Sequence, residues 1–342
     1  MSAPPIAFKR MGLVTSVGLS APTACAAMRE KLTNPSETRF TDSWGDWILA
    51  HQVELDCAYK GLAKLTRMAS LAIEEALACV PTEQWASIPL LLCVAESDRP
   101  GRLAGLDGDL LLGVQEALGV RFASNSATVA HGRTGVAVAL SRARTLVHQN
   151  SVSHVLVVAV DSIVNWSTLS YYERSGRLLT PHNSNGFAPG EGAGALLVAK
   201  PCGLPELACI GIGIGFEAAH IDSGQPLRAE GLSRAICAAL VDAGIEMHDV
   251  DYRITDLSGE HYYFKEAALA LSRTLRKRKA EFDIWHPAEC TGEAGALAGT
   301  TIIALADAAC RKGFGRGPTI MAHMANDDGQ RAALSLRFLG AG

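Results

Sequence analysis

Several features typical of other classes of protein are scarce in this chain of 342 residues. Aromatic residues make up 6% and the formal net charge is −4, so the chain has neither the basic surface nor the aromatic platform that binds nucleic acid. Charged residues account for 19% and hydrophobic residues for 48%, which provides ample apolar surface for a large core. We therefore expect a folded protein with no nucleic-acid partner.

Membrane, disulfide and zinc signals are also missing. No apolar run approaches the roughly 18 residues of a membrane span, and Met1–Arg10 has no stretch typical of a signal peptide. The nine cysteines form no CxxC pair, and most lie in apolar runs, which favours reduced core thiols over disulfides or zinc. They occupy positions 25, 57, 79, 93, 202, 209, 237, 290 and 310. We expect a soluble cytoplasmic protein with no membrane span, metal or cofactor.

Short β-branched runs alternate with longer alanine-rich stretches, which predicts parallel sheets covered by helices. The order repeats around residue 200, so we predict two similar halves, 1–200 and 201–342, with a seam at Pro201–Pro205. The predicted strands are Ile6–Gly12, Ile88–Ala95, Val155–Val160, Gly194–Ala199, Leu207–Phe216, Ile254–Leu257, Thr319–His323 and Ala332–Phe338. The predicted helices are Ser20–Leu32, Lys64–Ala78, Gly135–His148, Gly231–Ala243, Tyr263–Leu275 and Ala296–Ala309.

The glycine-rich segment Phe187–Val198, FAPGEGAGALLV, leads directly into a predicted strand. A phosphate loop would continue with Lys-Ser/Thr and a helix, and neither is present. The segment resembles the GF-x-x-GEGAG element of β-ketoacyl synthases. Lys9–Gly18, Arg67–Ala72 and Gly292–Ala296 resemble other segments of that family in the same order, so the resemblance extends from about residue 6 to 338.

This resemblance implies a thiolase-like α/β fold of five αβαβα layers, and the acyltransferase chemistry of 3-oxoacyl-carrier synthases in fatty acid or polyketide metabolism. It also implies that Glu191 is a buried structural carboxylate. The glycines around it would let neighbouring backbones approach closely. The family is dimeric, which implies a homodimer or a heterodimer with a synthase-like subunit. An acyl carrier protein is a further expected partner.

The resemblance fails at the three catalytic positions of the family. The stretch matching the nucleophile turn, Ala130–Leu140, places Gly132 where the family has its cysteine, or His131 if the alignment shifts by one residue. The two family histidines correspond to Ser258 and Glu289. Glycine or histidine, serine and glutamate cannot form a thioester by the family mechanism, although the turn could keep its backbone oxyanion hole.

A different chemistry in the same place is an alternative. His131, Glu260, His261, Glu289 and Cys290 would all lie near the centre of the fold if the alignment holds. A histidine beside a carboxylate can act as a general base, and Cys290 with His261 could form a displaced nucleophile. Structural roles for these side chains are the stronger interpretation, and their spacing matches no zinc pattern.

Two segments suggest contacts with partners or ligands. Arg273–Lys279, RTLRKRK, is either a solvated helix end or a docking patch for an acidic carrier protein. Trp166–Arg177 carries Tyr171 and Tyr172, which either line an interface or acyl channel or simply pack.

These observations favour a non-condensing protein that binds acyl chains or acyl-carrier partners, or pairs with an active synthase. The alternatives are an acyltransferase or hydrolase with a rebuilt site, and a structural or assembly protein without a ligand pocket.

Overall fold

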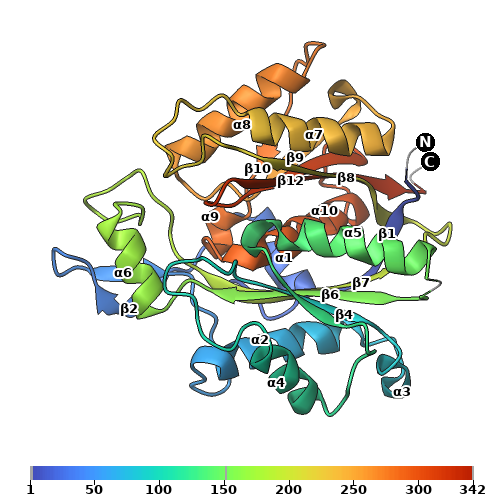
Figure 1. The fold of residues 1–342 in the computed structure, drawn as a ribbon, viewed down its shortest axis with the longest axis horizontal. Coiled ribbons are helices and arrows are strands. Elements are labelled where there is room, and N and C mark those ends of the chain that lie inside the picture. Colours follow the sequence, from blue (N-terminus) through green and yellow to red (C-terminus); the bar gives the residue numbers. More distant parts are fainter. Residues whose placement is uncertain (1–2, 151, 341–342) are drawn as a thin grey trace.

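A computed structural model describes residues 3–150 and 152–340. Within these ranges ten strands are hydrogen-bonded in the order β10-β9-β11-β12-β8-β1-β7-β6-β4-β5. Strands β8 and β1 pair only through Ile6 with Cys209 and Ala7 with Ala208. Because this junction is short, the strands form two layers on either side of it, as Figure 1 shows.

Strands and helices alternate along most of the chain, but three pairs of strands follow each other directly without a helix between them. The strands are β1 (Ile6–Val14), β2 (Ser36–Thr41), β3 (Trp47–Ala50), β4 (Leu90–Val94), β5 (Ala127–Ala130), β6 (Val155–Ser162), β7 (Glu191–Ala199), β8 (Glu206–Phe216), β9 (Tyr252–Thr255), β10 (Ile284–Trp285), β11 (Thr319–Ala325) and β12 (Gln330–Leu339). The α-helices are α1 (Ala21–Arg29), α2 (Gly61–Ala76), α3 (Thr82–Trp85), α4 (Asp109–Leu118), α5 (Gly135–His148), α6 (Trp166–Arg174), α7 (Glu230–Ala243), α8 (His261–Thr274), α9 (Ala288–Thr291) and α10 (Ala298–Arg311).

Helices cover both sheets and separate them from each other. Helices α7 and α8 lie on one outer face, and α2 and α4 lie on the other. Helices α1, α5 and α10 lie between the two sheets (Figure 1). The predicted five-layer αβαβα architecture is therefore confirmed. None of the helices in the described ranges has the length and hydropathy of a membrane span.

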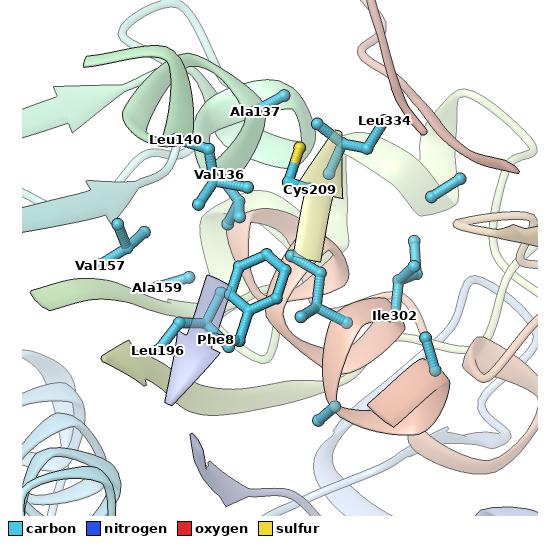
Figure 2. Packing of buried hydrophobic residues seen from close by; sticks show 14 of the residues in the cluster. Phe8, Val136, Ala137, Leu140, Val157, Ala159, Leu196, Cys209, Ile302 and Leu334 are labelled. Carbon is cyan, nitrogen blue, oxygen red and sulfur yellow. The ribbon is translucent and has the colours of Figure 1, made fainter. Parts of the chain in front are cut away.

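The central layer contains the main hydrophobic core. Figure 2 shows Phe8 of β1, Val136 and Leu140 of α5, Leu196 of β7 and Ile302 of α10 pointing toward one another. Strands β4 and β7 are buried along their whole length. Continuous apolar runs therefore indicated strands covered on both sides, as expected for an inner layer.

The prediction of purely parallel sheets is wrong. Strand β4 is parallel to β5 and β6, and β9 is parallel to β10 and β11, but every other pair in the sheet is antiparallel. Between β11 and β12 lie only residues 326–329, which is long enough for a hairpin turn and too short for a crossover to a parallel strand.

The strand order supports the proposed division of the chain at residue 200. Strands β1-β7-β6-β4-β5 and β8-β12-β11-β9-β10 follow the same order away from the central junction. Residues 200–205 connect β7 with β8, so the chain passes from one series to the other there. The boundaries 1–200 and 201–342 remain a prediction, which this repeat favours.

Candidate functional site

Acidic side chains lie at the carboxyl ends of strands from both sheets. Glu96 follows β4, Asp161 belongs to the end of β6, and Asp256 and Asp327 follow β9 and β11. The first three are buried, and the side chain of Asp327 is 17% exposed. Because isolated charges are costly to bury, each carboxylate requires cations or hydrogen-bond donors.

Arg99 joins two of these carboxylates. Its Nε and Nη2 donate to the two oxygens of Glu96 at 3.0 and 2.6 Å, and its Nη1 donates to Asp161 Oδ2 at 2.6 Å. Asp161 also accepts a bond from the Ala296 backbone N–H at 2.9 Å. The bidentate geometry fixes the guanidinium group between β4 and β6.

Asp327 is the centre of a second group of ion pairs. It accepts bonds from Arg177 at 2.7 and 3.1 Å, from Tyr172 at 3.1 Å, and from Arg133 and Tyr263. The two arginines have further carboxylate partners: Arg177 contacts Glu260 at 2.7 and 2.8 Å, and Arg133 contacts Glu293 at 3.3 Å. These residues come from five separate segments, and together they join the turn before α5 to α6, α8, the segment after α9 and the β11–β12 turn.

The protonation of these carboxyls follows their partners. Burial alone would raise the pKa of Asp327, but Arg133 and Arg177 outweigh it and lower this pKa far below its ordinary range. Burial likewise opposes ionisation of Glu96, and Arg99 overcomes it and lowers the pKa. Burial raises the pKa of Asp256 to about 7, against the lowering effect of Arg133. Asp327 and Glu96 are therefore anionic at neutral pH, while Asp256 titrates there.

Gly132 lies at the turn between β5 and α5 with a φ of +49°. A Cβ atom at this position would overlap the carboxylate of Glu96 and come within 3.2 Å of Asn326 Oδ1. The left-handed backbone conformation and the neighbouring carboxylate both favour glycine here. The Glu96 carboxylate therefore occupies the space that a side chain at position 132 would need.

Little space remains around this turn. The cavity lined by Glu96, Arg133, Tyr172, Arg177 and Asp327 has a volume of about 10 Å³. This is close to the minimum for one water molecule. An outer cavity of about 210 Å³ is lined by five carboxylates together with Arg99 and His220; the acids are Glu96, Asp98, Asp222, Asp327 and Asp328.

The structure brings some of the predicted site residues together and separates others. Ser258 lies beside the buried Glu293, and half-buried His131 lies next to Gly132 with its Nδ1 2.9 Å from Gln330 Oε1. In contrast, His261 is exposed, and Glu289 lies at the surface 3.7 Å from Lys31. The expectation that these side chains all meet at the centre is wrong, because α8 and α9 turn two of them outward.

Cys290 is buried in the main hydrophobic cluster, away from solvent. Burial and the nearby Glu289 raise the pKa of its thiol to about 11, so it is protonated at neutral pH. In the part of the chain that the structure describes, exposed His261 and buried Cys290 form no hydrogen bond with each other. Among residues 3–150 and 152–340, no group of three or more His, Cys, Asp or Glu side chains is arranged to bind a metal ion.

The glycine-rich segment has the local structure that its sequence indicated. Glu191 is buried, and it accepts bonds from the Val53 backbone N–H at 2.9 Å and Ser162 Oγ at 2.8 Å, with Lys64 as its ion-pair partner. A side chain at Gly192 would overlap the backbone of Val14. The close approach of backbones therefore explains this glycine.

The two tyrosines of α6 have different environments. Tyr172 is buried and donates to Asp327, whereas Tyr171 is 39% exposed and lines the outer acidic cavity. The basic segment Arg273–Lys279 follows the opposite end of α8 from Glu260 and Tyr263. Because α8 has 14 residues, it places this segment roughly 20 Å from the ion pairs.

The main charged residues of the site were not predicted from the sequence: Glu96, Arg99, Arg133, Asp161, Arg177, Glu293 and Asp327. A usable signal was present, since several acids directly follow apolar strands, and carboxyl ends of parallel strands meet at one edge of a sheet. Their arginine partners carry no comparable signal.

Comparison with known proteins relates this chain to others by its fold alone. No protein-family profile and no curated protein sequence matches the chain. Similar solved structures include a type II polyketide acyl-carrier protein in complex with its ketosynthase, AntDE:AntF, with a TM-score of 0.82 and 16% identity over 98% of this chain and 100% of that one.

Two further structures agree. The ishigamide ketosynthase/chain length factor has a TM-score of 0.79 and 17% identity, covering 99% of this chain and 100% of the other. A β-ketoacyl synthase from Burkholderia phymatum has a TM-score of 0.74 and 15% identity, with coverage of 99% and 100%. The chain therefore has the thiolase-like fold of ketosynthases over 98–99% of its length. At these identities the likeness shows the fold and leaves the activity open.

Proposed function

We propose that this protein is a non-condensing subunit of ketosynthase fold that pairs with a synthase-like partner in fatty acid or polyketide-type metabolism. The observation that carries the proposal is the turn at Gly132. The resemblance to β-ketoacyl synthases aligns this residue with the nucleophile, or His131 if the alignment shifts by one residue. Gly132 has no side chain, a left-handed φ of +49° and the Glu96 carboxylate beside it.

The closed interior supports this proposal. An acyl thioester would have to displace the ion pairs around Asp327, because the adjoining cavity of about 10 Å³ admits no group larger than water. Separating buried charges that are bonded on several sides costs several kcal/mol per group, roughly 3–5 kcal/mol for a broken pair. The carboxylates of the outer cavity also oppose the approach of an anionic thioester such as a coenzyme A derivative.

A pairing role agrees with the structures that share this fold. Some of the similar chains come from complexes of a ketosynthase with an acyl-carrier protein or a chain length factor. A chain that keeps the whole fold without a reaction centre can contribute an interface to such an assembly. The acyl-carrier contact through Arg273–Lys279 is less favoured, because this segment lies at the far end of α8 from the site.

The two alternatives have weaker support. An enzyme with a rebuilt site would need His131, His261 or Cys290 near one another, yet His261 is exposed and Cys290 is buried in the apolar core. A protein without any ligand pocket disagrees with cavities of about 400 and 560 Å³ elsewhere in the molecule.

Intact-mass spectrometry tests the absence of condensing chemistry. The purified chain is incubated with acetyl-, malonyl- and octanoyl-coenzyme A, with an active β-ketoacyl synthase as positive control, and release of CO₂ from the malonyl thioester is followed in parallel. We expect an adduct and decarboxylation in the control only. An acyl adduct on this chain, located by peptide mapping, would overturn the proposal.

A second experiment tests the pairing. A tagged form of the chain is expressed in its source cells, and copurified proteins are identified by mass spectrometry and by reciprocal tagging of the protein found. We expect a ketosynthase-type protein in a defined complex with this chain. Light scattering that gives only self-association, with no such protein in the reciprocal experiment, would count against pairing.

A further inference from the structure

Five arginines are buried in the part of the chain that the structure describes, and one of them differs from the rest. Four have a carboxylate oxygen within 3.3 Å of the guanidinium group; they are Arg99, Arg133, Arg177 and Arg331. The fifth is Arg253 of β9, which is 7% exposed and has no carboxylate at ion-pair distance among the described residues. Because an isolated charge is costly to bury, the anion that would compensate Arg253 has to come from outside these residues.

The pKa values show the same difference between Arg253 and the other buried arginines. Acidic partners raise the pKa of the four paired guanidinium groups. Burial lowers the pKa of Arg253, and no neighbouring acid offsets this effect. The nearby ring of His323 supplies no negative charge, since burial, Arg253 and Arg331 lower its pKa to about 3 and keep it neutral.

The hydrogen-bonding capacity of Arg253 is also largely unused. Its guanidinium carbon lies 4.8 Å from the centre of the Phe282 ring, and its Nη2 donates to the Phe282 backbone oxygen at 3.4 Å. Its Nε is buried without a partner. A guanidinium group has five N–H donors, and the aromatic ring attracts the charge without accepting most of these bonds. The side chain therefore has donors to offer as well as a charge.

A second cation lies against the same aromatic ring. Lys279 Nζ is 4.9 Å from the centre of the Phe282 ring, so Lys279 and Arg253 are both close to this side chain. Lys279 ends the segment Arg273–Lys279, in which five of seven residues are basic. None of these five has a carboxylate at ion-pair distance within the described ranges. Several unpaired cations around one point favour an anion with more than one negative charge.

We propose that Arg253 and Lys279 form an oxyanion site that binds a phosphate group. The planar guanidinium group can donate to two phosphate oxygens at once, and the lysine adds a second positive charge. The site lies beside the short edge strand β10, at the end of α8 that is far from the Gly132 turn, and binding there involves no covalent step. The inference is independent of the proposed pairing role, so the loss of either one leaves the other intact.

Isothermal titration calorimetry at constant ionic strength tests the site. Inorganic phosphate and pyrophosphate represent a free ligand, a neutral peptide with one phosphoserine represents a phosphate group on a protein, and acetate represents a carboxylate. We expect saturable one-to-one binding of the phosphate probes and binding about tenfold weaker or less for acetate, because acetate carries a single charge. Tighter binding of pyrophosphate than of the peptide would assign the site to a free phosphate compound, and the reverse order would assign it to a phosphorylated protein.

Two variants locate the binding site. Arg253→Met removes the charge and keeps an unbranched side chain beside Phe282, whereas Arg253→Lys keeps the charge and loses the planar fork of donors. We expect each to weaken pyrophosphate binding about tenfold or more. Arg234→Met is the matched control, because it also removes one positive charge, but from an exposed arginine of α7 that has Glu230 at 3.5 Å. This control should bind pyrophosphate as the unchanged protein does.

Thermal unfolding in phosphate-free buffer separates a ligand site from a packing role. An unpaired buried charge destabilises the protein without its ligand, so the Tm of Arg253→Met should be at least as high as that of the unchanged protein. Pyrophosphate should then raise the Tm of the unchanged protein more than that of the variant. No saturable binding of any phosphate probe overturns the proposal. A variant Arg253→Met that has a lower Tm and binds pyrophosphate equally well would give this arginine a packing role only, and would also overturn it.

Discussion

Replacement of Asp327 by alanine tests the ion pairs around the Gly132 turn. The carboxylate accepts bonds from Arg133, Arg177, Tyr172 and Tyr263, and its side chain is 17% exposed. Removal of one partner of a buried charge group costs about 3–5 kcal/mol, because the other charges lose their compensation. Arg177 keeps Glu260 at 2.7 Å and Arg133 keeps Glu293 at 3.3 Å, so we expect the lower end, about 3 kcal/mol.

Urea unfolding followed by circular dichroism measures this free energy of unfolding. Asp98→Ala is the matched control, because Asp98 is an exposed acid that lines the same outer cavity. Its replacement should change the free energy of unfolding by no more than about 0.5 kcal/mol. If Asp327→Ala is destabilised by less than about 1 kcal/mol relative to Asp98→Ala, the ion pairs do not contribute as argued.

The pH dependence provides a second check. Arg133 and Arg177 lower the pKa of Asp327 in the folded state, so its contribution is complete above the pKa of an unfolded aspartate, about 4. Below that pH the contribution decreases as the carboxyl of the unfolded chain takes up a proton. The difference between the unchanged protein and Asp327→Ala should therefore be constant from pH 5 to 8 and shrink below pH 4. A difference that grows on acidification would refute the assigned ionisation.

Two further predictions concern single positions. Burial raises the pKa of Asp256 to about 7, so the stabilising contribution of this residue is present at low pH and is lost as pH rises through 7. The variant Asp256→Asn can still accept the hydrogen bond from the Ala325 backbone N–H. In thermal unfolding it should be more stable than the unchanged protein at pH 8.5 and similar to it at pH 4. No gain at pH 8.5 would contradict this reasoning. Gly132→Ala should cost more free energy of unfolding than Gly119→Ala, since both glycines have left-handed φ values, but only Gly132 lies against Glu96. The left-handed backbone conformation alone costs a non-glycine residue about 1 kcal/mol. An equal loss of unfolding free energy in the two variants would show that the Glu96 side chain moves aside without cost.

Much of the fold could be predicted because its signals are local. The helix Gly135–His148 has the predicted bounds, and Ser20, the first residue of the predicted helix Ser20–Leu32, is the N-cap of α1. Apolar runs of strand length became fully buried strands. The hairpin of β2 and β3 was missed, since its strands are only six and four residues long and are partly exposed.

The site was predicted less completely, because its residues lie far apart along the chain. Gly132 and Ser258 lie near the ion pairs, whereas the side chains of Glu289 and His261 are exposed to solvent. A motif aligned by order alone does not specify which way a helix turns its side chains. The directions of the strands were also misjudged, since alternation of strand and helix fits both parallel and mixed sheets.

The sequence by itself therefore determined the layered α/β fold, the glycine-rich strand around Glu191 and the lack of a cysteine at the turn before α5. Only the tertiary structure decided what occupies that turn. Glu96, Arg133 and Asp327 are separated by 37 and 194 positions along the chain, and they meet because strands of the two sheets end at the same place. The pattern of apolar and polar residues within one helix or strand indicates which of its side chains are buried. It does not indicate which charged residues at the ends of distant strands will pair, because that depends on how the sheets assemble.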